Sequence, residues 1–264
     1  MRRRPALLAG LAGLLALAGG GAAAEADRPD PDDPYQSWPW LDMKRELIGS
    51  APMRYEPRVV VLGPAFAEDP MNVPISVRVD PVLGAVERIV VLVDRNPIKR
   101  VLDFEPLQAL PAIGFRFKLE QASPVRAAVK LRQGGWVVGG TWVDSAGGGC
   151  TVSGATRQDG SWAQSLGQVS ARLFSRAGQD SGAARLRLQV MHPMDTGLVA
   201  GVPAFYVNRL AVRDAQGREL ARLQAYEPVS ENPVFSVDFA VPPPGGVQIT
   251  GTDNNGNRFA QRLP

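Results

Sequence analysis

Few side chains could do chemistry, because the 264-residue sequence contains one cysteine, Cys150, and one histidine, His192. Zinc, haem and iron–sulfur sites need several thiolate or imidazole ligands, so this composition argues against all three. A serine or cysteine triad would have to use His192 as its base. We therefore expect no metal and no cofactor. What remains is the chemistry of a single thiol, which reacts as its thiolate.

The surroundings of Cys150 predict that this thiol is presented to a partner. Three glycines, Gly147, Gly148 and Gly149, come directly before it, and Gly154 follows. Glycine has no side chain to pack and tolerates most backbone angles, so the stretch predicts a flexible arm. A buried structural cysteine and a disulfide between two copies of the chain are the alternatives. No basic residue adjoins Cys150, so a partner is expected to activate it.

His192 lies between Met191 and Met194. We expect a structural role, because a lone histidine in a β-domain is more often a satisfied buried residue than a catalyst. One alternative is a weak copper or iron site, since thioether and imidazole groups suit soft metals. Another is a role that faces a partner near the arm.

The N-terminus indicates export. Residues 1–24 combine three arginines, a short apolar stretch and a small-residue cleavage site, which is typical of a secretory signal peptide. The three arginines account for the whole formal net charge of +3, so we expect no nucleic-acid partner. No other apolar run is long enough to span a membrane. We predict a periplasmic protein whose residues 25–36 form a flexible polar leader.

The elements that position the thiol are mainly strands. A short helix is expected from Ser37, its cap, to Gly49, with Trp38 and Trp40 packing it onto a sheet. Alternating or β-branched segments bounded by turn residues then predict two sets of strands. The first set is 58–62, 73–80, 88–94, 101–104, 115–120, 125–131 and 136–144, and the second is 169–174, 184–191, 205–214, 219–226, 234–241, 247–252 and 258–263.

Between the two sets, the composition changes to glycine, serine and glutamine without a sustained period, which predicts a linker. The fold class is therefore all-β, with two immunoglobulin-like β-sandwich domains and a short N-terminal helix before the first. The predicted boundaries are 37–146 for the first domain, 147–165 for the arm and linker, and 166–264 for the second domain. We expect the domains to pack on each other, with Cys150 exposed outside their interface.

The first domain resembles SoxY, the sulfur-carrier subunit of the bacterial thiosulfate-oxidising system. The resemblance rests on a first domain that ends in a glycine-flanked cysteine, on the strand 73–80, and on the strand 89–94 followed by the Asn96-Pro97 turn. The second domain resembles SoxZ. Its most specific feature is the run from His192 through Pro193, Met194, Thr196 and Gly197, followed by the segments 205–208 and 229–233.

This resemblance implies a carrier that is not an enzyme. In the family, a cysteine sulfur bonds covalently to a sulfur-containing intermediate, and an arm delivers it to separate enzymes of sulfur-compound oxidation. Cys150 matches the carrier position. The family's arm is a free C-terminal Gly-Gly-Cys-Gly-Gly, however, whereas here a second domain follows, so the arm is held at both ends.

Fused carriers of this kind are associated with quinoprotein dehydrogenases. One alternative function is therefore a non-catalytic accessory or binding module of a periplasmic quinoprotein (PQQ) dehydrogenase system. Another is a redox partner that cycles through an intermolecular disulfide.

Overall fold

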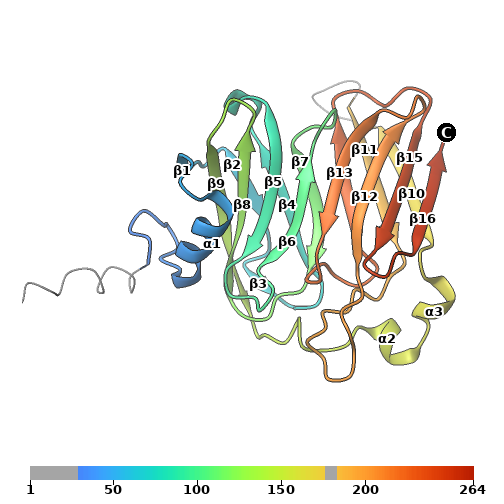
Figure 1. Ribbon diagram of the computed structural model, residues 1–264, viewed down its shortest axis with the longest axis horizontal. Helices are drawn as coiled ribbons and strands as arrows, with labels where there is room; N and C mark the ends of the chain where they lie inside the picture. Colours follow the sequence, from blue (N-terminus) through green and yellow to red (C-terminus); the bar gives the residue numbers. More distant parts are fainter. Residues whose placement is uncertain (1–28, 176–182) are drawn as a thin grey trace, which may run out of the picture.

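The computed structural model describes residues 29–175 and 183–264 of the chain. The predicted signal peptide, residues 1–24, lies outside the described residues. The chain begins with helix α1 (Trp38–Ile48) and continues almost entirely as strands (Figure 1). The first half contains β1 (Met53–Tyr55), β2 (Val59–Leu62), β3 (Phe66–Ala67), β4 (Val73–Val79), the 3-10 helix η1 (Pro81–Leu83), β5 (Val86–Val93), β6 (Arg100–Glu105), β7 (Ala112–Phe117), β8 (Ser123–Leu131) and β9 (Trp136–Ser145).

Two short helices and seven strands form the second half. They are α2 (Ala155–Asp159), α3 (Trp162–Ser165), β10 (Val169–Ser175), β11 (Ala184–Val190), β12 (Val207–Asp214), β13 (Glu219–Ala225), β14 (Val234–Phe239), β15 (Val247–Asp253) and β16 (Arg258–Leu263). The all-β prediction is confirmed, and each predicted strand has its counterpart within a few residues. None of the helices in the described part of the chain is long and apolar enough to cross a bilayer.

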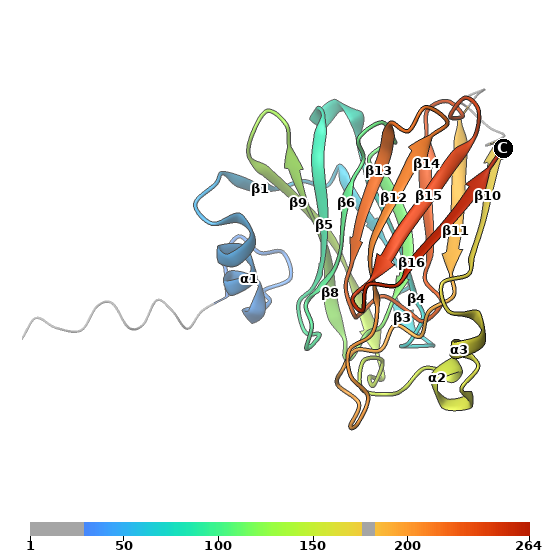
Figure 2. The same ribbon diagram turned by 45° about the vertical axis from the view of Figure 1, so that its right-hand side comes forward.

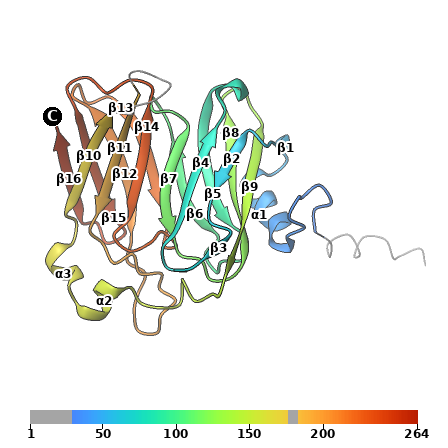
Figure 3. The same ribbon diagram turned by 180° about the vertical axis from the view of Figure 1, so that it is seen from behind.

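The strands form two sheets that face each other, and both sheets run through both halves of the chain. The ten-stranded sheet has the order β1-β9-β8-β5-β6-β13-β12-β15-β16, with β3 paired to β9. The six-stranded sheet, seen from behind in Figure 3, has the order β10-β11-β14-β7-β4-β2. Antiparallel pairing of β6 with β13 and of β7 with β14 joins the halves. The two predicted sandwiches are thus joined edge to edge, because each sheet continues from one half of the chain into the other.

The register at the seam explains why the halves share one core. Phe104 of β6 lies opposite Leu223 of β13, and Ile113 of β7 lies opposite Val237 of β14. All four side chains are buried in one hydrophobic cluster that continues across the seam. Burial of apolar surface in this shared core therefore stabilises the association of the two halves. The halves do not meet through an interface separate from their cores.

Helix α1 covers the outer face of the ten-stranded sheet at one end of the molecule (Figure 2). Trp40 and Met43 are buried against Val90 of β5 and Val138 of β9. The indole of Trp40 also donates a hydrogen bond to the Tyr55 hydroxyl at 2.6 Å. Trp38 is 57% exposed, because it lies on the opposite face of the helix, so the prediction that both tryptophans pack was wrong for Trp38.

The part of the leader that the structure describes is bound to the sheet, contrary to the prediction of a flexible segment. Asp33 is buried and accepts two hydrogen bonds from the Arg126 guanidinium, at 2.7 and 2.8 Å. Arg126 also pairs with Asp94 at 2.8 Å. Two carboxylates thus share one buried cation, which ties residues 29–36 to the middle of β8.

The predicted linker is likewise folded. The carboxylate of Glu231 accepts hydrogen bonds from the backbone N–H groups of Ala155 and Thr156, at 3.0 and 2.8 Å, which satisfies the first donors of α2. Trp162 of α3 packs edge-on against Phe205 with ring centroids 5.8 Å apart. These contacts hold α2 and α3 against one end of the second half (Figure 1).

Candidate functional site

The glycines before Cys150 dock the arm onto the first half. After β9 the backbone adopts left-handed angles at Gly147 (φ +96°) and Gly148 (φ +86°), which glycine accepts without strain. The N–H of Gly148 donates to the Glu120 carbonyl at 3.1 Å, and that of Gly149 donates to the Leu119 carbonyl at 3.2 Å. The arm therefore lies along residues 118–120, which continue from β7.

Gly149 must lack a side chain for this arm to dock. A Cβ there would lie 2.6 Å from the carbonyl oxygen and 2.7 Å from the nitrogen of Leu119, and closer still to the carbonyl oxygen of Pro70. All three atoms belong to the backbone, so no side chain can turn away to make room. The glycines thus permit close approach as well as unusual backbone angles.

The thiol of Cys150 is buried, with 1% of the residue exposed. Its Sγ lies 3.5 Å from the Lys118 carbonyl oxygen, and its backbone N–H donates to the Glu120 carboxylate at 2.8 Å. Its carbonyl oxygen accepts a hydrogen bond from the Thr196 hydroxyl at 2.7 Å. The prediction of an exposed thiol outside the contact between the halves was wrong. Cys150 lies between them because both halves supply hydrogen bonds to its backbone.

Asn96 holds the segment against which the arm lies. Its side-chain amide donates to the Lys118 carbonyl at 2.7 Å and accepts from the Glu120 N–H at 2.8 Å. Asn96 is itself buried, 2% exposed. The Asn-Pro turn that marked the family resemblance thus fixes the strand extension beneath the thiol.

Lys118 places a buried amine beside the thiol. The residue is 2% exposed, and its ammonium donates a hydrogen bond to the Met194 carbonyl. Burial lowers the pKa of Lys118, while the neighbouring negative charges of Cys150 (as thiolate), Asp195 and Glu231 act to raise it. A charge in this position would favour a negatively charged group on Cys150.

Burial nevertheless dominates the titration of the thiol. It raises the pKa of Cys150 to about 12, the negative charge of Glu120 raises it further, and Lys118 opposes both. At neutral pH the docked thiol is therefore protonated and a poor nucleophile.

Sequence reasoning missed Lys118 and Glu120, which lie about 30 residues from Cys150 along the chain. Both residues do lie within the predicted strand 115–120, after two buried phenylalanines, Phe115 and Phe117. No pattern within the sequence, however, places that strand against residue 150.

The motif that begins at His192 forms the opposite wall of the site. Met194 is buried, adopts a left-handed angle (φ +51°) and turns its carbonyl toward Lys118. Thr196 binds the Cys150 carbonyl, while Pro193 is buried and Gly197 (φ +77°) completes the turn. The motif therefore contributes one side chain and one carbonyl to the surroundings of the thiol.

His192 contacts the backbone of Met194 on this side of the site. Its Nδ1 accepts a hydrogen bond from the Met194 N–H at 3.1 Å, so the proton of the neutral ring is on Nε2. Nε2 lies 3.5 Å from the Asp253 carboxylate, and the ring packs on Phe205 at 4.3 Å. Among the described residues, no three His, Cys, Asp or Glu side chains gather to hold a metal ion.

The buried imidazole predicts a loss of stability in mild acid. Burial lowers the pKa of His192 to about 4, although Asp253 and Asp195 act to raise it. An unfolded histidine titrates near pH 6.5, so below that pH the unfolded chain binds a proton that the folded chain does not. The free energy of unfolding should fall by about 2 kcal/mol through this group between pH 7.5 and pH 5.

Urea unfolding at both pH values checks this expectation, with His192→Asn as the matched variant because its amide oxygen can replace Nδ1 as an acceptor. The drop in stability should be smaller in the variant by that amount, since the carboxylates titrate in both proteins. Equal drops would contradict the expected role of His192.

Gly154 lies where the arm meets α2. It directly precedes that helix, and a Cβ there would lie 2.7 Å from the carboxyl carbon of Glu231. The segment from Gly147 to Gly154 is therefore anchored at both ends, by β9 on one side and by the Glu231-capped helix on the other.

Comparison with known proteins places two families side by side in this chain. The family described as sulfur oxidation protein SoxY matches residues 44–150, and the family described as sulphur oxidation protein SoxZ matches residues 172–264. Among solved structures, the sulfur carrier protein SoxY from Chlorobium limicola f thiosulfatophilum is similar with a TM-score of 0.36 and 19% identity, over 40% of this chain and 90% of that one. A search of curated proteins finds no significant match.

Proposed function

Because the chain belongs to the SoxY and SoxZ families, joined in one polypeptide, we propose that it is a carrier protein that holds a sulfur-containing intermediate covalently on Cys150. The observation that carries the proposal is the position of this cysteine. It is the only one in the sequence, the SoxY match ends on it, and the SoxZ half hydrogen-bonds it through Thr196. On this proposal, separate enzymes perform the catalysis.

The buried thiol implies two states of the arm. In the docked state, Cys150 is protonated and shielded from solvent. To react, the arm must leave residues 118–120 by turning at Gly147 and Gly148. Because the segment is anchored at both ends, the five residues that follow Ser145, ending at Cys150, set an upper limit of roughly 17 Å on how far the thiol can move from the end of β9.

Loading the carrier is a redox step. Bonding Sγ to the sulfur of a sulfur oxyanion removes two electrons and the thiol proton, so a partner redox enzyme must accept the electrons. Most such adducts are anions, so Lys118 in its protonated form would interact more favourably with one than with the neutral thiol. On this proposal, docking protects the loaded cysteine between enzymes.

The proposed setting is the periplasm, reached through the signal peptide predicted for residues 1–24. The proposed partners are enzymes of sulfur-compound oxidation or a quinoprotein dehydrogenase, with a small sulfur compound on Cys150.

Intact-mass measurement of protein purified from the periplasm tests the proposal. We expect adducts of about +32, +80 or +112 Da, corresponding to added sulfur, sulfite or thiosulfate. They should disappear on reduction and be absent from Cys150→Ser, a variant that keeps a buried hydroxyl near the Lys118 carbonyl. An adduct that persists in Cys150→Ser would place the modification elsewhere and contradict the proposal.

One observation favours a second function. The burial and high pKa of the thiol are also what an inert structural cysteine would show. In that case the protein is the accessory or binding module of a quinoprotein dehydrogenase system. An unmodified thiol in protein from cells that oxidise sulfur compounds would favour this function, and a doubled mass would indicate intermolecular disulfide pairing.

A further inference from the structure

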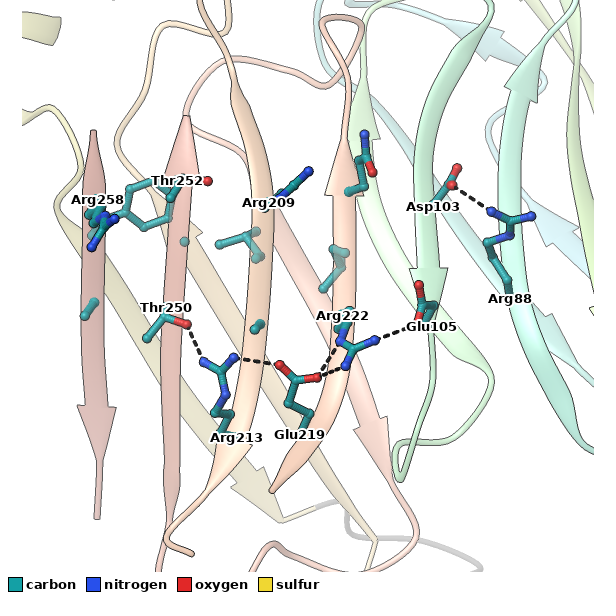
Figure 4. Close-up of a pocket in the computed structure, with 17 residues that line it drawn as sticks. Arg88, Asp103, Glu105, Arg209, Arg213, Glu219, Arg222, Thr250, Thr252 and Arg258 are labelled. Carbon is teal, nitrogen blue, oxygen red and sulfur yellow. Dashed lines mark hydrogen bonds and ion pairs between the residues drawn. The ribbon is translucent and has the colours of Figure 1, made fainter. Parts of the chain in front are cut away.

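An arginine-rich groove of about 850 Å³ lies on the outer face of the ten-stranded sheet (Figure 4). Its lining does not include Lys118, Glu120 or Thr196, which contact Cys150. Its charged lining comes from both halves, with Arg88 and Asp103 from the first half and Arg209, Arg213 and Arg258 from the second. We call it the arginine groove. Because the sheet is continuous across the seam, the groove exists only when the two halves are joined.

The register of the strands explains the hollow. Ala211 of β12 lies opposite Thr250 of β15, which lies opposite Ala260 of β16. These three small side chains form a row across the outward face of the sheet. In the next row, Arg209 lies opposite Thr252, which lies opposite Arg258. Long arginines thus flank a floor of small residues.

The charges in the groove are unbalanced. Glu219 pairs with Arg213 at 2.6 Å and also with Arg222, which contacts Glu105 at 3.3 Å. Asp103 is likewise engaged by arginines. Within the described part of the chain, exposed Arg209 and Arg258 have no carboxylate partner. Figure 4 shows both on the same side of the groove, apart from the network of ion pairs.

We propose that the arginine groove docks a carboxylate-bearing segment of a partner protein. Arg209 and Arg258 lie on strands separated by β15, so their backbones are roughly 10 Å apart at a spacing of about 4.8 Å per strand. Both are exposed, so they do not form the enclosed set of converging donors that holds a small anion. The distance instead matches two carboxylates three residues apart on a segment in the polyproline II conformation, which rises about 3.1 Å per residue and turns every third side chain to the same face.

Fluorescence anisotropy with a labelled Glu-Ser-Ser-Glu-Ser-Ser-Glu peptide tests this docking on the mature chain at low salt. Arg209→Glu/Arg258→Glu should weaken binding at least tenfold, because it replaces both unpaired cations with like charges. The matched control is Arg172→Glu/Arg187→Glu, a cross-strand pair of exposed arginines on the other sheet, which should change affinity less than twofold. Circular dichroism confirms that each variant is folded.

Three results would overturn the proposal. The first is no detectable binding at millimolar peptide, and the second is equal weakening in both double variants. The third is displacement of the peptide by thiosulfate, added at the same concentration as the peptide's carboxylates, under conditions in which sodium chloride of the same ionic strength has no effect. The last result would identify a small-anion site. None of them depends on whether Cys150 carries a sulfur adduct.

Discussion

Replacing Gly149 with alanine should increase the rate at which a maleimide reagent labels Cys150 by at least about 100-fold at pH 7.5. The new Cβ would overlap backbone atoms of Pro70 and Leu119, so the arm cannot dock in its present position. Undocking exposes the thiol and returns its pKa from about 12 toward the ordinary value near 8.5, which increases the thiolate fraction at pH 7.5 up to about 3,000-fold.

Gly148→Asn is the matched control, because nothing lies within 4 Å of a Cβ at that position and asparagine tolerates the left-handed angle better than other residues. It should label within a few-fold of the wild-type protein. If Gly149→Ala labelled as slowly as the wild-type protein, either the Pro70 loop would have moved aside or arm docking would not limit access to the thiol.

Replacing Arg126 with methionine should destabilise the protein by about 3–5 kcal/mol, because it leaves the buried carboxylates of Asp33 and Asp94 without their shared cation. Methionine retains much of the apolar stem that packs beside Trp40, whose ring centroid lies 4.4 Å from the guanidinium. Urea unfolding measures the loss. Limited proteolysis should also show new cleavage within residues 29–36, since their anchor is gone.

The control for this prediction is Arg45→Met, which breaks an exposed pair with Asp42 and should change the free energy of unfolding by less than about 0.5 kcal/mol. Adding Asp33→Asn to Arg126→Met should recover part of the loss, because it removes one of the two uncompensated charges. Equal stability of Arg126→Met and Arg45→Met would show that the leader does not depend on this ion network.

The sequence alone predicted most of the strands, since alternating burial and turn residues act over a few positions. Strand β4, for example, alternates strictly between buried and less buried residues. It did not predict β1 and β3, which have three and two residues and are too short to show a period. It also did not predict α2 and α3, because contacts with Glu231 and Phe205 hold these short helices in place.

The thiol shows the same division between local and tertiary information. Its identity, its single occurrence and its glycine arm are local features, and together with the strands 73–80 and 89–94 they were sufficient to indicate the SoxY family. The motif that begins at His192 was likewise a local feature and indicated SoxZ. The burial of the thiol was not predictable from these features. Cys150 is enclosed by Lys118 and Glu120 from one half and Thr196 from the other, and only the pairing of β6 with β13 and β7 with β14 brings those residues together. Sequence thus determined which atom can react, whereas tertiary packing decided that it is protonated and shielded while the arm is docked, because desolvation depends on every segment around the sulfur.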